Sequence, residues 1–248
     1  MITFNSVTST TMGAYKVSAV LRPASPGYDA QLLSVVGGAG GAYYQRKNRQ
    51  PLAIELRLWF RESSMANRRA KIRAVMEWLD LGEPAWLVVS DETTVRYEAV
   101  LVSEVPAFEP AGLGIVSLDF VFLVPSGYGV GTTQRIWDYV VPPLDVDFDN
   151  IGSAVCPALI RLTFAANVTD PKITLLGTGQ FIEIVGTYGV ADTLWIDTER
   201  FTVVNGTTDL RDKMTLYSEF FWLQPGTDKV VPANTNTAVR LYWFERWL

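Results

Sequence analysis

Apolar and polar residues alternate with a period of two along much of this chain, and this alternation restricts the fold to one built mainly of strands. The clearest case is residues 52–60, LAIELRLWF, in which every second side chain is large and apolar. Successive side chains of a strand point to opposite faces, so such a run buries one face and presents the other. Residues 114–124 and 239–247 repeat the pattern. We therefore expect a mainly β fold.

One segment, near residues 64–81, has helical periodicity instead. Ser63 or Ser64 is a suitable N-cap, and Gly82 and Pro84 stand where a helix would stop. Apolar residues recur between them at the spacing of one helix face. The residues of that face are Met65, Ile72, Val75, Met76 and Leu79. The outward face is basic, with Arg68, Arg69, Lys71 and Arg73. It is either a solvated face or a surface that meets an acidic neighbour.

The first half of the chain reads as an α+β domain over residues 1–144, with this one principal helix. Residues 23–44 look like a loop because Pro and Gly interrupt them, and residues 126–143 look like an interrupted stretch. Strands are predicted at 16–21, 52–60, 85–90, 96–105 and 114–124.

The second half, residues 145–248, has no helical period and reads as an all-β sandwich. Short β-prone runs are separated by Gly, Asn, Asp or Pro, which is typical of such folds. The Pro225-Gly226 step predicts a turn between the aromatic run 217–223 and the final strand 239–247. In that final strand Trp243 and Trp247 are expected to close the core. Strands are predicted at 158–164, 172–176, 180–185, 193–197, 201–204, 217–223 and 239–247.

Composition argues against several classes of protein. The chain has no histidine, which removes the commonest general base and metal ligand, and its one cysteine, Cys156, is expected to be a small buried hydrophobe. The net charge is −5, with the acidic excess in the second half, which argues against nucleic-acid binding there. No apolar run is long enough to span a membrane, and the first residues lack a signal-peptide layout. We expect synthesis in a cytoplasm.

Three patterns invite a chemical interpretation, and each has a simpler one. Asp145, Asp147 and Asp149 lack the Gly and Glu of an EF-hand loop, which favours a solvated linker over a metal site. Asp197 and Glu199 share a strand face, as many carboxylate pairs do without catalysing glycoside hydrolysis. Tryptophans of the second half form either a sugar-stacking platform or core and interface contacts. They are Trp195, Trp222, Trp243 and Trp247.

The order of several segments resembles the distal tail proteins of long-tailed, non-contractile bacteriophages, which are hub components of the tail tip. In the first half the match is the strand LAIELRLWF, the helix and its exit RRAKIRAVMEWLDLGEPAWLVV, then RYEAVLVSEVPAF and GIVSLDFVFLVPSGYG. In the second half it is FDNIGSAVCPALIRLTF, TLWIDTERFTVV and FFWLQPGTDKV. Together these segments cover almost the whole chain.

This resemblance implies a structural virion protein and no enzyme or cofactor. The N-terminal domain would build a ring, typically a hexamer, under the tail tube. The C-terminal domain would be a galectin-like or carbohydrate-module-like sandwich that serves as an attachment platform. Expected partners are the tail tube protein, the tail-associated fibre or lysin hub protein and receptor-binding proteins, with DNA only passing through the bore. The protein would be made in the host cytoplasm and located in the virion tail tip.

We expect the glycine-rich segment and the residues after it to contact the adjacent subunit of such a ring, since they combine glycine, tyrosine and arginine. These residues are Gly37, Gly38, Gly40, Gly41, Tyr43, Tyr44, Arg46, Lys47 and Arg49. Arg68, Arg69 and Arg73 of the helix are further candidates for partner contact. Two other functions remain open: a carbohydrate-binding sandwich that recognises a host surface, and a hydrolase, against which the missing histidine counts.

Overall fold

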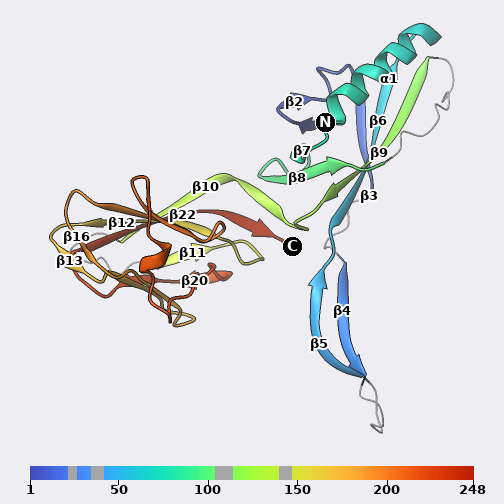
Figure 1. Cartoon of the computed structure of the whole chain (residues 1–248). Coiled ribbons are helices and arrows are strands. Elements are labelled where there is room, and N and C mark those ends of the chain that lie inside the picture. Colours follow the sequence, from blue (N-terminus) through green and yellow to red (C-terminus); the bar gives the residue numbers. More distant parts are fainter. Residues whose placement is uncertain (22–26, 35–41, 104–113, 140–146) are drawn as a thin grey trace. The chain divides into compact units, whose positions relative to one another are not determined.

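The computed structural model describes residues 1–21, 27–34, 42–103, 114–139 and 147–248. It confirms a mainly β chain, with one α-helix in these residues (Figure 1). The chain divides into two compact units, residues 1–130 and 131–247. The boundary predicted between residues 144 and 145 falls outside the described residues, so those domain limits remain a prediction.

The first unit is an antiparallel sheet with one helix. Its strands pair in the order β3–β6–β9–β8–β7–β1–β2. Two further strands, β4 and β5, pair with each other. The elements are β1 (Ile2–Phe4), β2 (Val7–Thr8), β3 (Lys16–Leu21), β4 (Tyr28–Ser34), β5 (Ala42–Arg49), β6 (Leu52–Arg61), α1 (Met65–Leu79), β7 (Ala85–Val89), β8 (Val95–Leu101) and β9 (Ile115–Val124).

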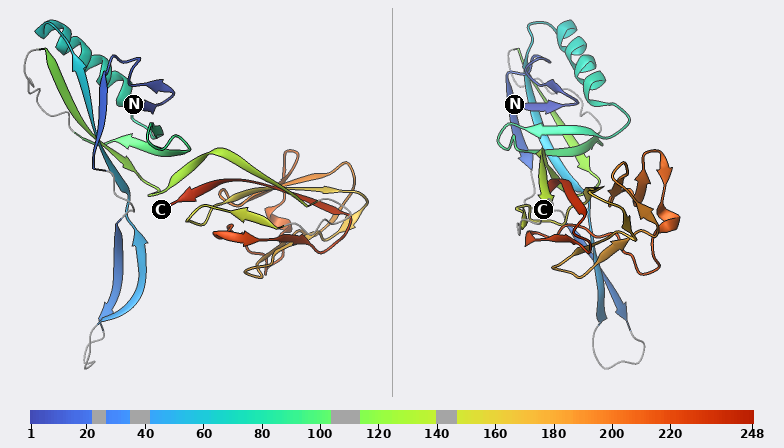
Figure 2. Two further views of the ribbon diagram at one scale, coloured as in Figure 1. Left: turned by 180° about the vertical axis from the view of Figure 1, so that it is seen from behind. Right: turned by 90° about the vertical axis from the view of Figure 1, so that its left-hand side faces the viewer.

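The core of this unit lies between α1 and the sheet, as the alternation predicts. On β6 and β9 every second side chain is buried, and Leu56 lies opposite Phe120. Figure 2 shows α1 lying along one face of these strands. The Ser64 hydroxyl caps the helix by accepting a hydrogen bond from the backbone N–H of Asn67, at 3.2 Å. The helix prediction is therefore confirmed to within two residues at its C-terminal end.

The prediction that Met65 belongs to the apolar face of the helix that packs on the core was wrong. Met65 is 51% exposed, whereas Trp78 is buried and its indole N–H donates to the carbonyl of Phe4 at 3.1 Å. Phe4 in turn packs against Phe122, with ring centroids 5.2 Å apart. The aromatic side chain reaches further into the sheet than a first-turn methionine, and its polar N–H finds a partner there.

The second unit is a β-sandwich. Its main sheet has the order β19–β18–β17–β12–β22–β10, and the smaller sheets are β11–β20, β13–β16 and β15–β14–β21. The elements are β10 (Gly129–Tyr139), β11 (Phe148–Asn150), β12 (Ala158–Phe164), β13 (Val168–Thr169), β14 (Lys172–Leu175), β15 (Phe181–Glu183), β16 (Thr187–Tyr188), β17 (Thr193–Asp197), β18 (Thr202–Asn205), β19 (Thr208–Asp209), the 3-10 helix η1 (Arg211–Lys213), β20 (Gly226–Asp228), β21 (Val230–Pro232) and β22 (Thr237–Trp247).

The final strand β22 occupies the middle of the main sheet, between β12 and β10. Trp243 is 5% exposed and packs against Phe148, with ring centroids 5.8 Å apart, as expected of a core residue. Trp247 is only half-buried, so the prediction that it closes the core was wrong. The inward position before it is taken by Glu245, 4% exposed, whose carboxylate accepts a hydrogen bond from Arg135 at 2.9 Å.

Two predictions about the aromatic run were also wrong. Residues 217–223 do not form a strand; Leu223 makes one isolated bridge to Cys156, and a turn hydrogen bond from Ser218 to Thr215 interrupts the run. Gly226, with φ of +97°, begins β20, which pairs with β11. The Pro-Gly step therefore does not join a hairpin between 217–223 and 239–247.

Two segments read as irregular contain strands. Residues 28–34 and 42–44, within the predicted loop 23–44, belong to β4 and β5, and residues 129–139, within the predicted interruption, are β10. The middle of β10 exposes five successive side chains, so the period of two is missing there. β10 forms a strand by pairing with β22, which is distant in the sequence, whereas β4 and β5 pair with each other.

Asn150 connects the start of the sandwich to its later segments through side-chain hydrogen bonds. It is fully buried, and its side-chain amide donates to the carbonyl oxygens of Ala154, Leu223 and Gln224 at 3.2–3.4 Å. Its side-chain oxygen accepts from the N–H of Gly152 at 3.2 Å. A Cβ at Gly152 would lie 2.5 Å from the carbonyl oxygen of Arg246, so this close approach requires glycine. The Asn-x-Gly motif thus joins three separate chain segments.

Replacing Asn150 by aspartate should destabilise the second unit strongly. The near-isosteric carboxylate would face three carbonyl oxygens with no proton to donate, at a cost of about 3 kcal/mol or more. Denaturant unfolding monitored on the full chain measures this loss. Asn234→Asp is the matched control, because Asn234 is exposed and its side-chain oxygen already acts as an acceptor, for the N–H of Asn236. Equal stability of the two variants would contradict the assigned role.

Candidate functional site

The β4–β5 hairpin belongs to the first unit but does not take part in the main sheet that forms the core of that unit. Its register runs from Tyr28 opposite Arg49 to Ser34 opposite Ala42, with an irregularity at Gln31/Leu32. Among the described residues these strands form a sheet of their own. Figures 1 and 2 show the hairpin extending away from the end of the unit that carries α1. An isolated two-stranded hairpin is marginally stable in water, so an external contact would stabilise it. We call residues 28–34 and 42–49 the arm.

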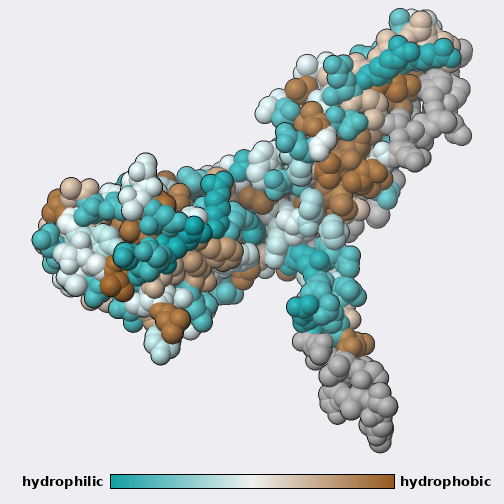
Figure 3. All heavy atoms as spheres, in the orientation of Figure 1, coloured by the Kyte–Doolittle hydropathy of each residue, from teal (hydrophilic) through white to brown (hydrophobic). Residues whose placement is uncertain are grey.

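The arm offers a polar surface with isolated apolar groups. Figure 3 shows it as largely hydrophilic, with a hydrophobic spot towards its far end. Tyr28 is 42% exposed and Leu32 is 59% exposed. Arg46 donates through Nε to the side-chain oxygen of Gln31 across the hairpin, at 2.6 Å. Exposed strand edges with such mixed side chains can pair with another chain through the backbone.

Arg49 fixes the base of the arm. Its guanidinium lies 3.7 Å from the ring centroid of Tyr128 and 5.8 Å from that of Tyr28, and it donates to the carbonyl of Gly127 at 3.3 Å. Gly127 has φ of +67°, and a Cβ there would lie 2.8 Å from the Arg49 side chain. Only glycine therefore lets the arginine lie against the backbone. Cation–π contacts of this kind contribute about 0.5–2 kcal/mol.

Replacing Arg49 by alanine should loosen the arm without unfolding the sheet. Amide hydrogen exchange in residues 28–34 and 42–49 should become roughly tenfold faster. The variant lacks the two cation–π contacts and the hydrogen bond of Arg49, so local opening of the arm costs less free energy. Mass-spectrometric exchange on peptides from the arm measures this. The control is Asn48→Ala, which shortens an exposed side chain of the same strand and leaves the Arg46–Gln31 hydrogen bond in place. Equal acceleration in both variants would show that Arg49 has no special role.

The structure brings several predicted contact residues onto this arm. Tyr43, Tyr44, Arg46, Lys47 and Arg49 all belong to β5, on a strand rather than in a loop. Tyr43 lies opposite Leu33 and Tyr44 opposite Leu32. Gly37, Gly38, Gly40 and Gly41 lie outside the described residues. The contact role of all these residues stays a prediction.

The arginines of α1 are not brought to the arm, since α1 lies at the other end of the unit (Figure 1). Arg68 donates to the carbonyl of Glu62 at 3.2 Å, and Lys71 donates to that of Met12 at 3.1 Å, so both serve contacts within the unit. Arg69 and Arg73 are exposed. They remain candidates for an acidic neighbour.

The partners of Arg49 were not predicted from the sequence. Tyr128 and Gly127 lie far along the chain, in the segment PSGYG that follows β9. In the sequence, a tyrosine next to a glycine directly after a long strand indicated the end of a domain. Nothing in the local pattern linked this tyrosine to an arginine more than seventy residues earlier.

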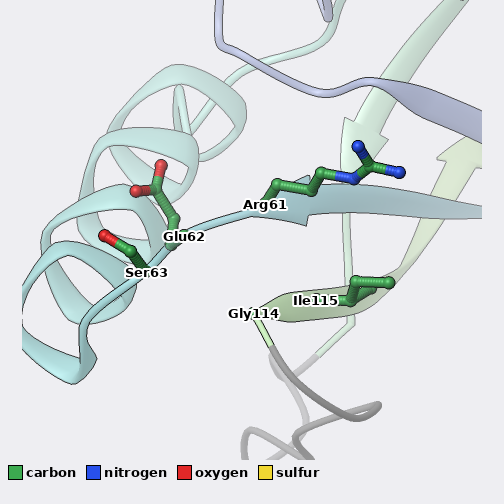
Figure 4. Close-up of a pocket in the computed structure, with 5 residues that line it drawn as sticks. All are labelled: Arg61, Glu62, Ser63, Gly114 and Ile115. Atoms are coloured by element: carbon green, nitrogen blue, oxygen red, sulfur yellow. The ribbon is translucent and has the colours of Figure 1, made fainter.

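A hollow of about 600 Å³ lies where β6 leads into α1. It is lined by Arg61, Glu62, Ser63, Gly114 and Ile115 (Figure 4). Glu62 and Ser63 lie on the side of the helix, whereas Arg61 points away from it. Arg61 also lies over the ring of Tyr15, at 4.8 Å. The polar groups do not converge on one point, so this hollow is not a persuasive ligand site.

The carboxylates singled out from the sequence have structural partners. Asp197 accepts hydrogen bonds from the backbone N–H groups of Glu199 and Arg200, at 2.9 and 3.0 Å, and Glu199 pairs with Arg246. Asp147 pairs with Lys229 at 3.4 Å. Asp145 lies outside the described residues. In the described part of the chain no group of three or more acidic or cysteine side chains is placed to hold a metal ion.

The four tryptophans of the second half do not form one platform. Trp243 faces the core, Trp195 faces the opposite side of the main sheet, and Trp222 donates its indole N–H to the carbonyl of Thr198 at 3.2 Å. Trp247 lies against Gly131. A groove of coplanar tryptophans, which the carbohydrate-binding alternative requires, is therefore absent from these residues.

Two smaller expectations concern the cysteine and the membrane. Cys156 is fully buried, and burial raises the pKa of its thiol to about 12. The interpretation of this residue as a small buried hydrophobe is confirmed. Across the described ranges, no helix combines the length and apolar character needed to cross a bilayer.

Comparison with known proteins gives a consistent result. Residues 151–247 match the family model of the siphovirus-type tail component, C-terminal domain. The crystal structure of SPP1 Dit (gp 19.1) is described as a paradigm of the hub adsorption apparatus in phages that infect Gram-positive bacteria. It superposes with a TM-score of 0.82 at 14% identity, covering 100% of this chain and 98% of that one. A chain of the phage P2 baseplate in its activated conformation with Ca gives a TM-score of 0.44 at 12% identity, over 92% of this chain and 90% of that one. No curated protein matches in sequence.

Proposed function

We infer that this chain is a structural hub protein at the tip of a phage tail. Its residues 151–247 match the C-terminal domain of the siphovirus-type tail components, and its fold resembles that of SPP1 Dit over its whole length. The family match and the whole-chain fold likeness support this role. No step of it requires catalysis. The protein would act in the virion, after synthesis in the host cytoplasm.

The single observation that carries the ring proposal is the arm. A closed ring needs two different surfaces on each subunit that meet head to tail. The arm supplies one such surface, since it projects from the sheet and buries no core of its own. Its exposed backbone edges and side chains such as Leu32 would be covered by the next subunit. We propose that the first unit builds a ring of about six copies in this way, the number that the distal tail resemblance implies.

The same proposal assigns partners to the two ends of the ring. The tail tube protein would bind on one side and the fibre or lysin hub protein on the other, and receptor-binding proteins would attach to the second unit. DNA would pass through the bore. The acidic excess lies in the second half of the chain, so a bore lined by the first unit would carry no net positive charge to retain DNA.

Native mass spectrometry combined with negative-stain electron microscopy tests the ring. We expect a mass near six times the 27.6 kDa of one chain and round particles with a central hole. The measurement should be repeated at several protein concentrations, because a closed ring dissociates cooperatively. A monomer or an open-ended series of masses at all concentrations would contradict the proposal.

A further inference from the structure

The outward face of the main sheet in the second unit carries an unusual row of side chains. Trp195 on β17 lies opposite Arg161 on β12, and Arg161 lies opposite Arg240 on β22. All three are partly exposed and alternate with core residues on their strands. Two arginines directly opposite each other repel, which destabilises a sheet unless anions compensate. This row is therefore not explained by the stability of the fold.

Only one of the two arginines has an anionic partner. Arg240 pairs through two nitrogens with the Asp138 carboxylate, one of them at 3.0 Å. Among the described residues the side chain of Arg161 forms no ion pair or hydrogen bond. Its contact is with the ring of Trp195, whose centroid is 5.9 Å from the guanidinium carbon. The Nε of Arg161 is moreover buried without a hydrogen-bond partner. Buried donors without a partner are rare in folded proteins and often mark a place for a ligand or ion.

A hollow opens beside this unpaired group. It measures about 170 Å³ and is bordered by Arg161, Thr163, Arg240 and Asp138. A water molecule takes up about 30 Å³ in the liquid, so the hollow has room for a carboxylate together with part of a larger group. Thr163 adds a hydroxyl that donates or accepts. Asp138 is already held by Arg240, which leaves the charge of Arg161 uncompensated.

Aromatic rings lie next to the charge of Arg161, outside the lining of the hollow. Trp195 and Tyr242 stack with centroids 6.0 Å apart and an interplanar angle of 28°. Rings of this kind pack against the C–H faces of a ligand, while an arginine binds its oxyanion. An acidic sugar unit combines these two properties, whereas a neutral sugar lacks the anion and a bare anion lacks the apolar face.

We propose that this face of the second unit binds the carboxylate of an acidic saccharide, with Arg161 as the anion-binding residue and Trp195 as its apolar border. The site is separate from the arm and does not depend on ring formation. It also differs from a platform of four tryptophans, because Trp243 belongs to the core.

Titration of the full-length protein with sodium glucuronate tests the proposal, with glucose as the neutral match and inorganic phosphate as the bare anion. Calorimetry or saturation-transfer NMR should show saturable glucuronate binding at millimolar concentration, weakened by added salt. Glucose and phosphate should bind at least about tenfold more weakly, since each lacks one of the two contacts.

Arg161→Gln and Arg200→Gln form a matched pair of variants. Both remove one positive charge from the second unit, but Arg200 is a surface residue whose side chain is 83% exposed. Arg161→Gln should weaken glucuronate binding at least about tenfold, and Arg200→Gln should leave it unchanged. Unfolding curves confirm that both variants are folded. No saturable binding, equal binding of glucose, equal binding of phosphate, or an equal effect of the two variants would each overturn the proposal.

Discussion

Removing residues 239–248 should unfold the second unit while the first unit still folds and assembles. The deleted segment is most of β22, which lies between β12 and β10 in the main sheet. It contributes Val239, Leu241 and Trp243, each 5% exposed or less, to the core. Losing one such side chain costs about 2–5 kcal/mol, and a whole domain is stable by only about 5–15 kcal/mol. The free energy that the strand contributes therefore exceeds the stability of the whole unit.

Differential scanning calorimetry of the truncated chain measures this. We expect the transition of the second unit to disappear and that of the first unit to remain, with the oligomer mass reduced only by the deleted residues. Deleting Leu248 alone is the control, because this residue lies beyond β22 and is 43% exposed. A cooperative second transition in the truncated chain would show that the strand is dispensable.

Excising the arm should abolish the proposed ring and leave the fold of the first unit intact. The backbone N–H of Gln50 donates to the carbonyl of Gly27 at 2.8 Å, so the two ends of the arm are already adjacent. An Asn-Gly linker in place of residues 28–49 can therefore close the gap as a two-residue turn. The sheet pairings of β3, β6 and β9 do not involve the removed residues.

Native mass spectrometry should then give the mass of a monomer, with an unfolding midpoint within a few degrees of the intact protein's. A second variant that lacks only residues 37–41 separates the contribution of the glycine-rich segment from that of β4 and β5. If the excised chain keeps the oligomer of the intact protein, the arm does not hold the ring together. If it fails to fold, Arg49→Ala and the shorter deletion still report on assembly.

The elements that could be predicted from the sequence are those in which the order of apolar and polar residues shows which face is buried. β6, β9 and β12 alternate without interruption, and α1 has both a cap and a stop signal, so these could be placed to within a few residues. β4 and β5 could not be placed, because a hairpin without a core beside it needs no alternation. β10 was not predicted for a similar reason, because successive side chains in the centre of this strand are all exposed.

The candidate site was predictable only in part. Composition pointed to the segment that contains Arg46 and Arg49, because glycine, tyrosine and arginine cluster there. The sequence did not show that Arg49 fixes the arm, since Tyr128 becomes its neighbour only through folding. Likewise, Arg161 and Arg240 are far apart in sequence, and only the register of β12 and β22 makes them opposite.

The burial of Cys156 has a practical consequence. It is the one cysteine of the chain, it is fully enclosed, and its thiol has a pKa near 12, so it stays protonated and unreactive at neutral pH. The natural protein is therefore a background into which a single thiol can be introduced. Leu32→Cys would place that thiol on the exposed arm, where a fluorophore or spin label attaches selectively. Distances between labels on different subunits would then map the assembly directly, without first replacing a native cysteine.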